Sequence, residues 1–173
     1  LDFSANLNPL GPPEWLAPLL IDQGRHISHY PDPDRAALHA AISERFQVSP
    51  DTVITGNGST ELLYLLPRAA RKSRALIPCP AYIDYAKAAR LAGLAIDTVP
   101  LAAADNFRPD PDALDRIITK DHIVFIGTPN NPTGAVYSAG ELTQLADILD
   151  RASSKFGRRI YLVSDEPYGK IAY

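Results

Sequence analysis

Residues 123–134 read Ile-Val-Phe-Ile-Gly-Thr-Pro-Asn-Asn-Pro-Thr-Gly, an apolar run of strand length that passes directly into a turn rich in proline, asparagine and glycine. The same arrangement occurs three more times, at residues 52–59, 75–82 and 160–168. In each case the short apolar segment predicts a buried strand, and the residues that follow it predict a turn. Helical patterns lie between these segments, at about residues 59–70, 83–92, 111–118 and 139–152.

This alternation of strands and helices predicts an α/β fold, with a three-layer, doubly wound and mostly parallel sheet. Two of the helices carry boundary signals. Ser138 and Glu141 form a capping-box pattern, and Gly93 follows its helix as a left-handed stop would. Pro67 is expected to kink or end the helix that begins near Ser59.

The first part of the chain has a different character. Residues 1–13 carry three prolines, which predict an extended arm and a turn rather than a helix. A helix is expected from Asp32, which can cap it, to near Val48. Because the chain begins at Leu1 without methionine and stops just after a strand-like run, we expect it to be a trimmed or partial chain.

Composition excludes several classes of protein. The 173 residues are 46% hydrophobic and 21% charged, which is typical of a globular domain. Lys plus Arg number 17 against 20 for Asp plus Glu, a net charge of −3 without like-charge runs, so nucleic acid is not expected as a partner. No membrane is expected either, because the longest apolar stretches, such as residues 62–66 and 123–126, are far shorter than the roughly 18 residues of a membrane helix. The single cysteine, Cys79, cannot form an internal disulfide, and a reducing, cytoplasmic location is expected.

The four turns place candidate chemistry at one edge of the predicted sheet, because ligands bind beyond the carboxyl ends of parallel strands. In Gly56-Asn-Gly-Ser-Thr-Glu61, the backbone amides of Gly58, Ser59 and Thr60 can surround a phosphate at the start of a helix. The segment lacks the lysine of a P-loop. A plain turn with Ser59 as helix cap explains it equally well.

Three other residues at this edge have both a functional and a structural interpretation. Asp165 ends a buried strand and needs a partner, either a protonated heterocyclic nitrogen or an arginine. Asn131 can project an amide or belong to a plain turn, and Tyr82 can be a stacking face or simply core. With the phenol of Tyr168, the set matches the requirements of a flat, phosphorylated, pyridine-like cofactor such as pyridoxal phosphate.

These segments together resemble the fold-type I pyridoxal-phosphate enzymes of aminotransferase class I and II, over essentially the whole chain. Residues 1–11, 30–33 and 56–61 look most like threonine-phosphate decarboxylase, an enzyme of cobamide synthesis, and histidinol-phosphate aminotransferase. Residues 130–137 and 164–168 look more like aspartate and aromatic aminotransferases. The resemblance implies an N-terminal arm and the start of a small-domain segment at 1–31, followed by a partial large, cofactor-binding domain at 32–173.

The resemblance also implies a role for each matching residue. Ser59 and Thr60 would hold the cofactor phosphate, and Tyr82 would stack on the pyridine ring. The catalytic pair would be Asp165, on the pyridine nitrogen, and Tyr168, which with Asn131 would donate to the ring oxygen.

Three residues of the N-terminal part are carried over in the same way. Tyr30 would reach the phosphate of a neighbouring subunit, which implies a homodimer with shared sites. Asn8 and Gly11 would belong to an arm that closes over the substrate carboxylate.

The lysine that forms the Schiff base lies on a later segment in this family, so this chain alone is expected to be inactive. For the complete enzyme we expect transamination of an amino acid or a phosphorylated amino acid, with threonine-phosphate decarboxylation as the alternative. A non-catalytic ligand-sensing or dimerisation module of the same fold, and an unrelated nucleotide-binding α/β domain, are the competing interpretations.

Overall fold

The computed structural model describes residues 8–170. Its contacts divide the chain into two compact units, residues 1–54 and residues 55–173, and each is described by itself. The sequence boundary after residue 31 concerns the domains of a complete enzyme, and it stays a prediction.

The first unit is helical. It contains α1 (Leu16–Gln23), the short 3₁₀ segments η1 (Gly24–His26) and η2 (Pro50–Thr52), and α2 (Ala36–Phe46). The helix predicted from Asp32 begins only at Ala36, because Arg35 adopts a left-handed conformation with φ of 52°. Asp32 still has a capping role, since its carboxylate accepts the N–H groups of Asp34 and Ala36 at 3.0 and 2.9 Å.

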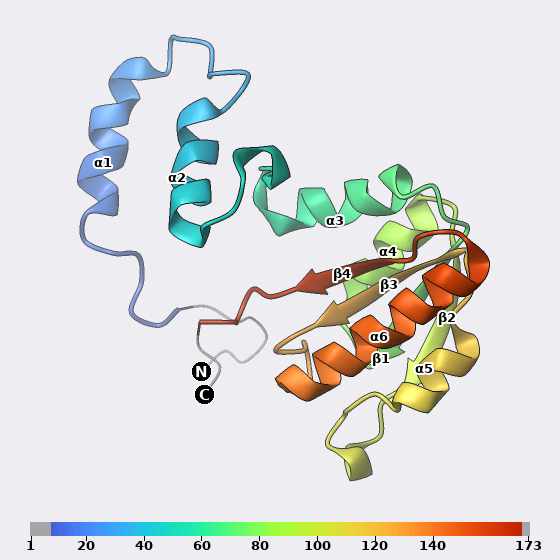
Figure 1. Ribbon diagram of the computed structural model, residues 1–173. Helices are drawn as coiled ribbons and strands as arrows, with labels where there is room; N and C mark the ends of the chain where they lie inside the picture. Colours follow the sequence, from blue (N-terminus) through green and yellow to red (C-terminus); the bar gives the residue numbers. More distant parts are fainter. Residues whose placement is uncertain (1–7, 171–173) are drawn as a thin grey trace. The chain divides into compact units, whose positions relative to one another are not determined.

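The second unit is built on a sheet of four parallel strands in the order β2-β1-β3-β4. The strands are β1 (Arg74–Cys79), β2 (Ala95–Pro100), β3 (His122–Gly127) and β4 (Tyr161–Asp165). The helices of this unit are α3 (Gly58–Ala69), α4 (Ile83–Leu91), α5 (Pro111–Ile117) and α6 (Ala139–Phe156), with a 3₁₀ segment η3 (Ala103–Asp105) (Figure 1).

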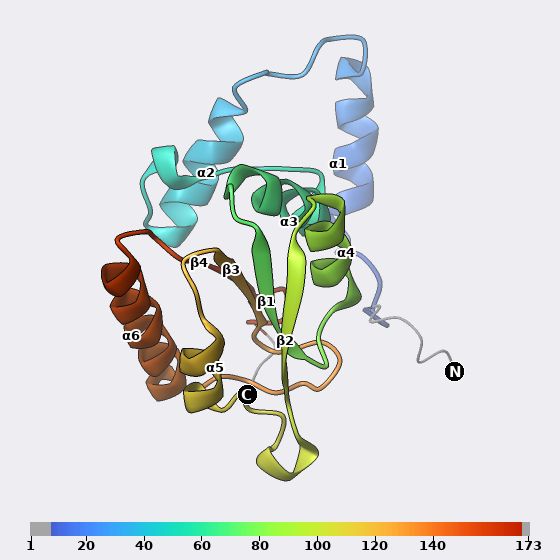
Figure 2. The ribbon, with the colours of Figure 1, turned by 90° about the vertical axis from the view of Figure 1, so that its right-hand side faces the viewer.

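Two apolar clusters, one on each face of the sheet, form the core. Alternate residues of a strand point to opposite faces, so Ile123 and Phe125 of β3 join the cluster beneath α3 and α4. Val124 and Ile126 join the cluster beneath α5 and α6. Figure 2 shows the sheet between these two pairs of helices. The predicted three-layer, doubly wound architecture is therefore confirmed.

One strand prediction is wrong, and one strand was not predicted. Residues 52–55 form no strand, and Ile54 is 73% exposed, so this short apolar segment does not join the sheet. The strand that was not predicted is β2, an edge strand in which only Val99 is buried. Its polar residues hide the continuous apolar pattern that marks the central strands.

The helix boundary signals have mixed outcomes. The capping box is present, with Ser138 accepting the N–H of Glu141 and the Glu141 carboxylate accepting the N–H of Ser138. Gly93 follows α4 with φ of +77°, as predicted. Pro67 does not end α3 where it stands, because this buried residue lies inside the helix, which continues to Ala69.

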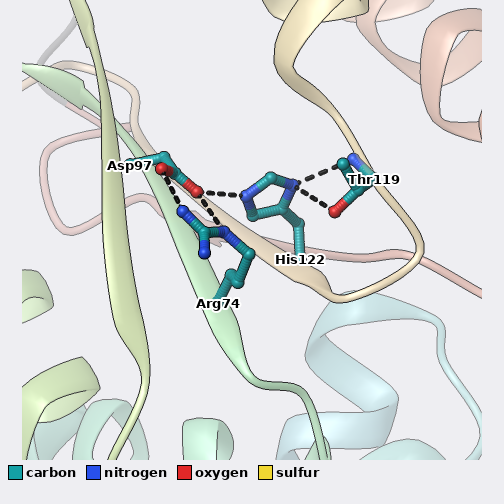
Figure 3. A network of polar contacts seen from close by, with 4 residues as sticks. All are labelled: Arg74, Asp97, Thr119 and His122. Atoms are coloured by element: carbon teal, nitrogen blue, oxygen red, sulfur yellow. Dashed lines mark hydrogen bonds and ion pairs between the residues drawn. The ribbon is translucent and has the colours of Figure 1, made fainter.

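A polar network ties the amino ends of three strands together (Figure 3). Asp97 of β2 binds Arg74 of β1 at 2.5 and 2.6 Å and Nε2 of His122 of β3 at 2.7 Å. His122 is 1% exposed, and its Nδ1 accepts the N–H of Thr119 at 2.9 Å. Since Nδ1 accepts, Nε2 carries the proton that His122 donates to Asp97. Among residues 8–170, no helix has the length and apolar character needed to cross a membrane.

Candidate functional site

A cavity of about 180 Å³ lies at the carboxyl ends of β3 and β4, within the second unit. Its walls include five of the residues that the sequence analysis selected: Ser59, Tyr82, Asn131, Asp165 and Tyr168. Three further residues line it that were not selected: Tyr85, Pro129 and Pro167. The edge of the sheet predicted from the turns thus holds a cavity with a carboxylate, an amide, a hydroxyl and phenols in its walls.

Asp165 is the last residue of β4 and is half-buried beside the apolar strand β3. It lies opposite Gly127 of β3, and its backbone oxygen accepts the N–H of Thr128 at 3.0 Å. Its carboxylate accepts a hydrogen bond from the hydroxyl of Tyr85, with 2.8 Å between Oη and Oδ2. Burial, together with this carboxylate, raises the pKa of Tyr85 well above its ordinary value, so Tyr85 stays a neutral donor.

The turn after β3 separates its two asparagines into different roles. Asn130 is 7% exposed, and its side chain donates to the backbone oxygen of Pro80 at 3.0 Å and to the hydroxyl of Thr133 at 2.8 Å. These bonds fix the shape of the turn. The next residue, Asn131, lines the cavity. The structure therefore leaves the amide of Asn131 available for a ligand while Asn130 holds the loop.

Tyr82 immediately precedes α4, and its ring is restrained from two sides. Its hydroxyl donates to Asp84 at 3.0 Å, and Asp84 also forms an ion pair with Lys87 at 3.1 Å. The ring of Tyr82 meets the ring of Tyr85 edge-on, with centroids 5.7 Å apart. The hydrogen bond to Asp84 and burial raise the pKa of Tyr82. A ring held in this way is suited to stacking against a flat ligand.

The first turn of α3 is the anion-binding candidate. The N–H of Gly58 is already bonded to the oxygen of Gly56 at 2.9 Å, so this amide is less available than the sequence analysis expected. The N–H groups of Ser59 and Thr60 lie in the first turn, where a helix offers them no acceptor of its own. Glu61 binds the N–H of Asn57 at 2.6 Å and thereby holds the entry to the helix. Ser59 lines the cavity, and Thr60 follows it in the same turn.

The remaining predicted residues belong to the first unit. Asn8 and Gly11 form a local turn, in which the Asn8 amide donates to the oxygen of Gly11 at 3.1 Å. The Asn8 amide is therefore engaged within its own turn in this structure. Tyr30 is fully exposed. Residues 1–7 of the predicted arm lie outside the described residues.

Sequence reasoning missed Tyr85, although a signal for it exists. Tyr85 stands three residues after Tyr82, a spacing that puts both side chains on the same side of a helix. Asp165 and Asn131 were predicted because they stand where a strand ends, and that criterion selects only residues of the turns. Tyr85 reaches the same cavity from within α4, so the criterion does not select it.

Comparison with known proteins agrees with this architecture. All 173 residues match the family described as aminotransferase class I and II. Threonine-phosphate decarboxylase from Salmonella typhimurium is 35% identical over 97% of this chain and 44% of its own length. Histidinol-phosphate aminotransferase from Sphingopyxis alaskensis is 38% identical over 99% of this chain and 48% of its own length.

Aspartate aminotransferase from Thermus thermophilus has a similar structure, with a TM-score of 0.79 and 27% identity, over 89% of this chain and 42% of that one. The chain thus spans less than half the length of each of these proteins. Because the family match covers every residue from 1 to 173, the chain belongs to the aminotransferase class I and II family.

Proposed function

We propose that this chain is the larger part of the pyridoxal-phosphate site of an amino-acid aminotransferase. The observation that carries the proposal is the cavity at the ends of β3 and β4. Asp165, Asn131 and Tyr82 line this cavity together with Ser59 of the first turn of α3. Members of this family generally depend on pyridoxal phosphate. The residues present fit that group, since each of its polar parts finds a partner of opposite character.

Each residue of the cavity has a defined task in this proposal. Ser59 and Thr60 hold the phosphate with their hydroxyls and with the N–H groups of the α3 first turn. Tyr82 covers one face of the ring. Asn131 and Tyr168 would donate to the ring oxygen, and Asp165 would accept a hydrogen bond from the ring nitrogen and keep that nitrogen protonated. When bound, the group supplies an electron sink for charge that develops at the α-carbon of the substrate.

The electrostatic task of Asp165 is the most demanding one. A carboxylate opposite the ring nitrogen favours the cationic ring, which attracts electrons more strongly than a neutral ring does. The strand end fixes the backbone of Asp165, so the charge is in place before a substrate arrives. Such preorganised charge is effective because it needs no rearrangement during the reaction.

For the substrate, we propose an amino acid or a phosphorylated amino acid. Two of the similar proteins carry the names of phosphate esters, threonine phosphate and histidinol phosphate. That similarity supports an anionic substrate, with Asn8 and Gly11 in the arm that closes over it.

Threonine-phosphate decarboxylation is the second candidate. It is favoured by the 35% identity with the Salmonella typhimurium decarboxylase over 97% of the chain. The two reactions share the cavity residues named above, and they differ in the substrate bond that is held perpendicular to the ring. Asp165 and Tyr82 act on the cofactor in both reactions, so neither residue discriminates between them.

We further propose a cytoplasmic homodimer with shared sites, in which Tyr30 of each subunit reaches the other's phosphate. Full exposure of Tyr30 is what such a contact requires of the isolated chain.

The test uses the complete protein that carries this chain. The expected result is a yellow protein whose visible absorption is bleached by borohydride. A colourless protein that ignores added pyridoxal phosphate would favour the non-catalytic or nucleotide-binding interpretation.

The second step supplies threonine phosphate with and without a keto acid. Product formation that requires the keto acid supports transamination. Release of carbon dioxide without a keto acid would replace it by decarboxylation.

A further inference from the structure

The side chain that accompanies Asp165 is Tyr85, which none of the roles above includes. It is 2% exposed, and its ring stacks on Phe125 of β3 with centroids 5.5 Å apart and an interplanar angle of 22°. Its hydroxyl reaches Oδ2 of Asp165 at 2.8 Å. Tyr85 thus spans the distance from α4 to the end of β4 and is held along its whole length.

A glycine makes this reach possible. A Cβ atom added to Gly127 would lie 3.0 Å from the hydroxyl oxygen of Tyr85 and 3.3 Å from Oδ1 of Asn130. Both distances are tighter than ordinary contacts of a Cβ atom, and both neighbours are held by hydrogen bonds. Gly127 lies opposite Asp165 in the sheet, so the missing side chain leaves room where Tyr85 and Asp165 meet.

The hydrogen bond has two physical consequences for Asp165. It stabilises the ionised carboxylate, which is half-buried beside the apolar strand β3 and gains a donor there. It also fixes the rotation of the carboxylate, because Oδ2 is held by a donor that is itself packed between two rings. Tyr85 binds Oδ2 and not Oδ1, and Asp165 lines the cavity, so the carboxylate keeps a second oxygen that can face a ligand there.

We propose that Tyr85, with the space left by Gly127, is the positioning residue that orients Asp165 toward the ring nitrogen of the cofactor. The inference rests on the proposed function. It goes beyond it by assigning a task to a buried helix residue and to a glycine, neither of which donates a group to the ligand.

The experiment measures dissociation constants of two ligands for the complete protein. One is pyridoxal phosphate, and the other is its analogue in which CH replaces the ring nitrogen.

The first variant is Tyr85→Phe, which keeps the stacked ring and removes only the hydroxyl. Because a hydrogen bond to a charged group is worth roughly a factor of ten in binding, this variant is expected to bind pyridoxal phosphate about tenfold more weakly. Its affinity for the analogue should stay within about twofold, since the analogue has no ring nitrogen to interact with the carboxylate of Asp165.

Two further variants test the route of the effect. In an Asp165→Asn background, Tyr85→Phe is expected to produce no additional loss of affinity for pyridoxal phosphate. Gly127→Ala should reproduce the selective loss, and in a Tyr85→Phe background it should cost less, because the added methyl no longer meets a hydroxyl.

Tyr137→Phe is the matched control. Tyr137 is a tyrosine whose pKa is raised to about 12 by burial, and it lines a different cavity, beside Leu114 and Leu145. This variant should change the affinity for neither ligand.

Each outcome decides the inference. Equal losses for both ligands in Tyr85→Phe would reduce Tyr85 to a packing residue, and no loss for either would remove its role altogether. Either result would overturn the inference and leave the proposed function standing. If the unaltered protein binds no pyridoxal phosphate, the proposed function itself fails.

Discussion

Asp165 ends a strand that lies beside the apolar residues of β3, where its carboxylate accepts a hydrogen bond from Tyr85 and lines the cavity. Its position could be predicted from the sequence, because a carboxylate directly after an apolar run must lie at the carboxyl edge of a parallel sheet. Asn131 was found by the same rule. The partner of Asp165 could not be predicted, because the rotation of α4 about its axis decides whether Tyr85 faces the sheet.

The substitution Asp165→Asn tests the proposed charge. Asparagine has nearly the same shape and can still accept from Tyr85, but it does not keep the ring nitrogen protonated. The phosphate contacts are untouched, so we expect much of the cofactor affinity to be retained, with a loss of about tenfold, similar to that of Tyr85→Phe. Turnover should fall by about a hundredfold or more, since each pKa unit lost at the ring nitrogen corresponds to about 1.4 kcal/mol. Steady-state kinetics at saturating cofactor measure this.

Thr60→Ala supplies the contrast for Asp165→Asn. It removes a hydroxyl from the first turn of α3 and should chiefly weaken cofactor retention, with turnover of the loaded enzyme nearly unchanged. Normal turnover in Asp165→Asn would make Asp165 a structural residue and invalidate the proposed assignment.

At the scale of elements, the central strands were predictable and the edges of the sheet were not. All six residues of β3 are buried, and after His122 the sequence is an unbroken apolar run, Ile123 to Ile126. In β2 the third residue is Asp97, and this charge breaks the pattern on which the prediction depends. The structure explains the charge, because Arg74 and His122 of the neighbouring strands both bind it (Figure 3). Such a pairing between strands cannot be seen in one segment.

This network predicts a pH dependence of stability. Hydrogen bonds from Arg74 and then His122 lower the pKa of Asp97 to about 2 from an ordinary value of 3.8. A carboxyl group whose pKa is lower in the folded state stabilises the fold above its unfolded pKa. That contribution is lost as the pH falls from about 4 to about 2. The free energy of unfolding should therefore decrease across this interval, as measured by urea unfolding at a series of pH values.

Asp97→Asn is the variant that isolates the Asp97 contribution. It should be less stable than the unaltered protein at pH 6, and the difference should shrink toward pH 2, where Asp97 itself is about half protonated. A difference that stays constant from pH 6 to pH 2 would show that the network acts through packing and not through charge. Asp112→Asn is the control for the loss of a surface carboxylate. Asp112 is exposed and is not one of the residues that bind Asp97.

At the scale of the whole molecule, the second unit carries the cavity, whereas Tyr30 lies in the first unit, where it is fully exposed. Exposed apolar side chains are common in that unit, with Leu10 90% and Ile27 87% exposed. Sequence patterns predicted a helix from Asp32, which begins at Ala36 in the structure, but they predicted neither α1 nor what covers these surfaces, because periodicity records only the packing within one chain. A second subunit is the covering that the proposed role of Tyr30 requires.

Mixing two defective variants tests whether sites are shared between subunits. Tyr30→Ala and Asp165→Asn should each be impaired alone. If Tyr30 acts on the neighbouring site, a hybrid dimer combines Asp165 from one subunit with Tyr30 from the other and holds one intact site. When equal amounts are unfolded together and refolded, random pairing makes about half of the dimers hybrid, so about a quarter of all sites recover. Activity should rise to roughly that fraction of the unaltered enzyme. If Tyr30 acts within its own subunit, every site of the hybrid keeps a defect and mixing restores nothing.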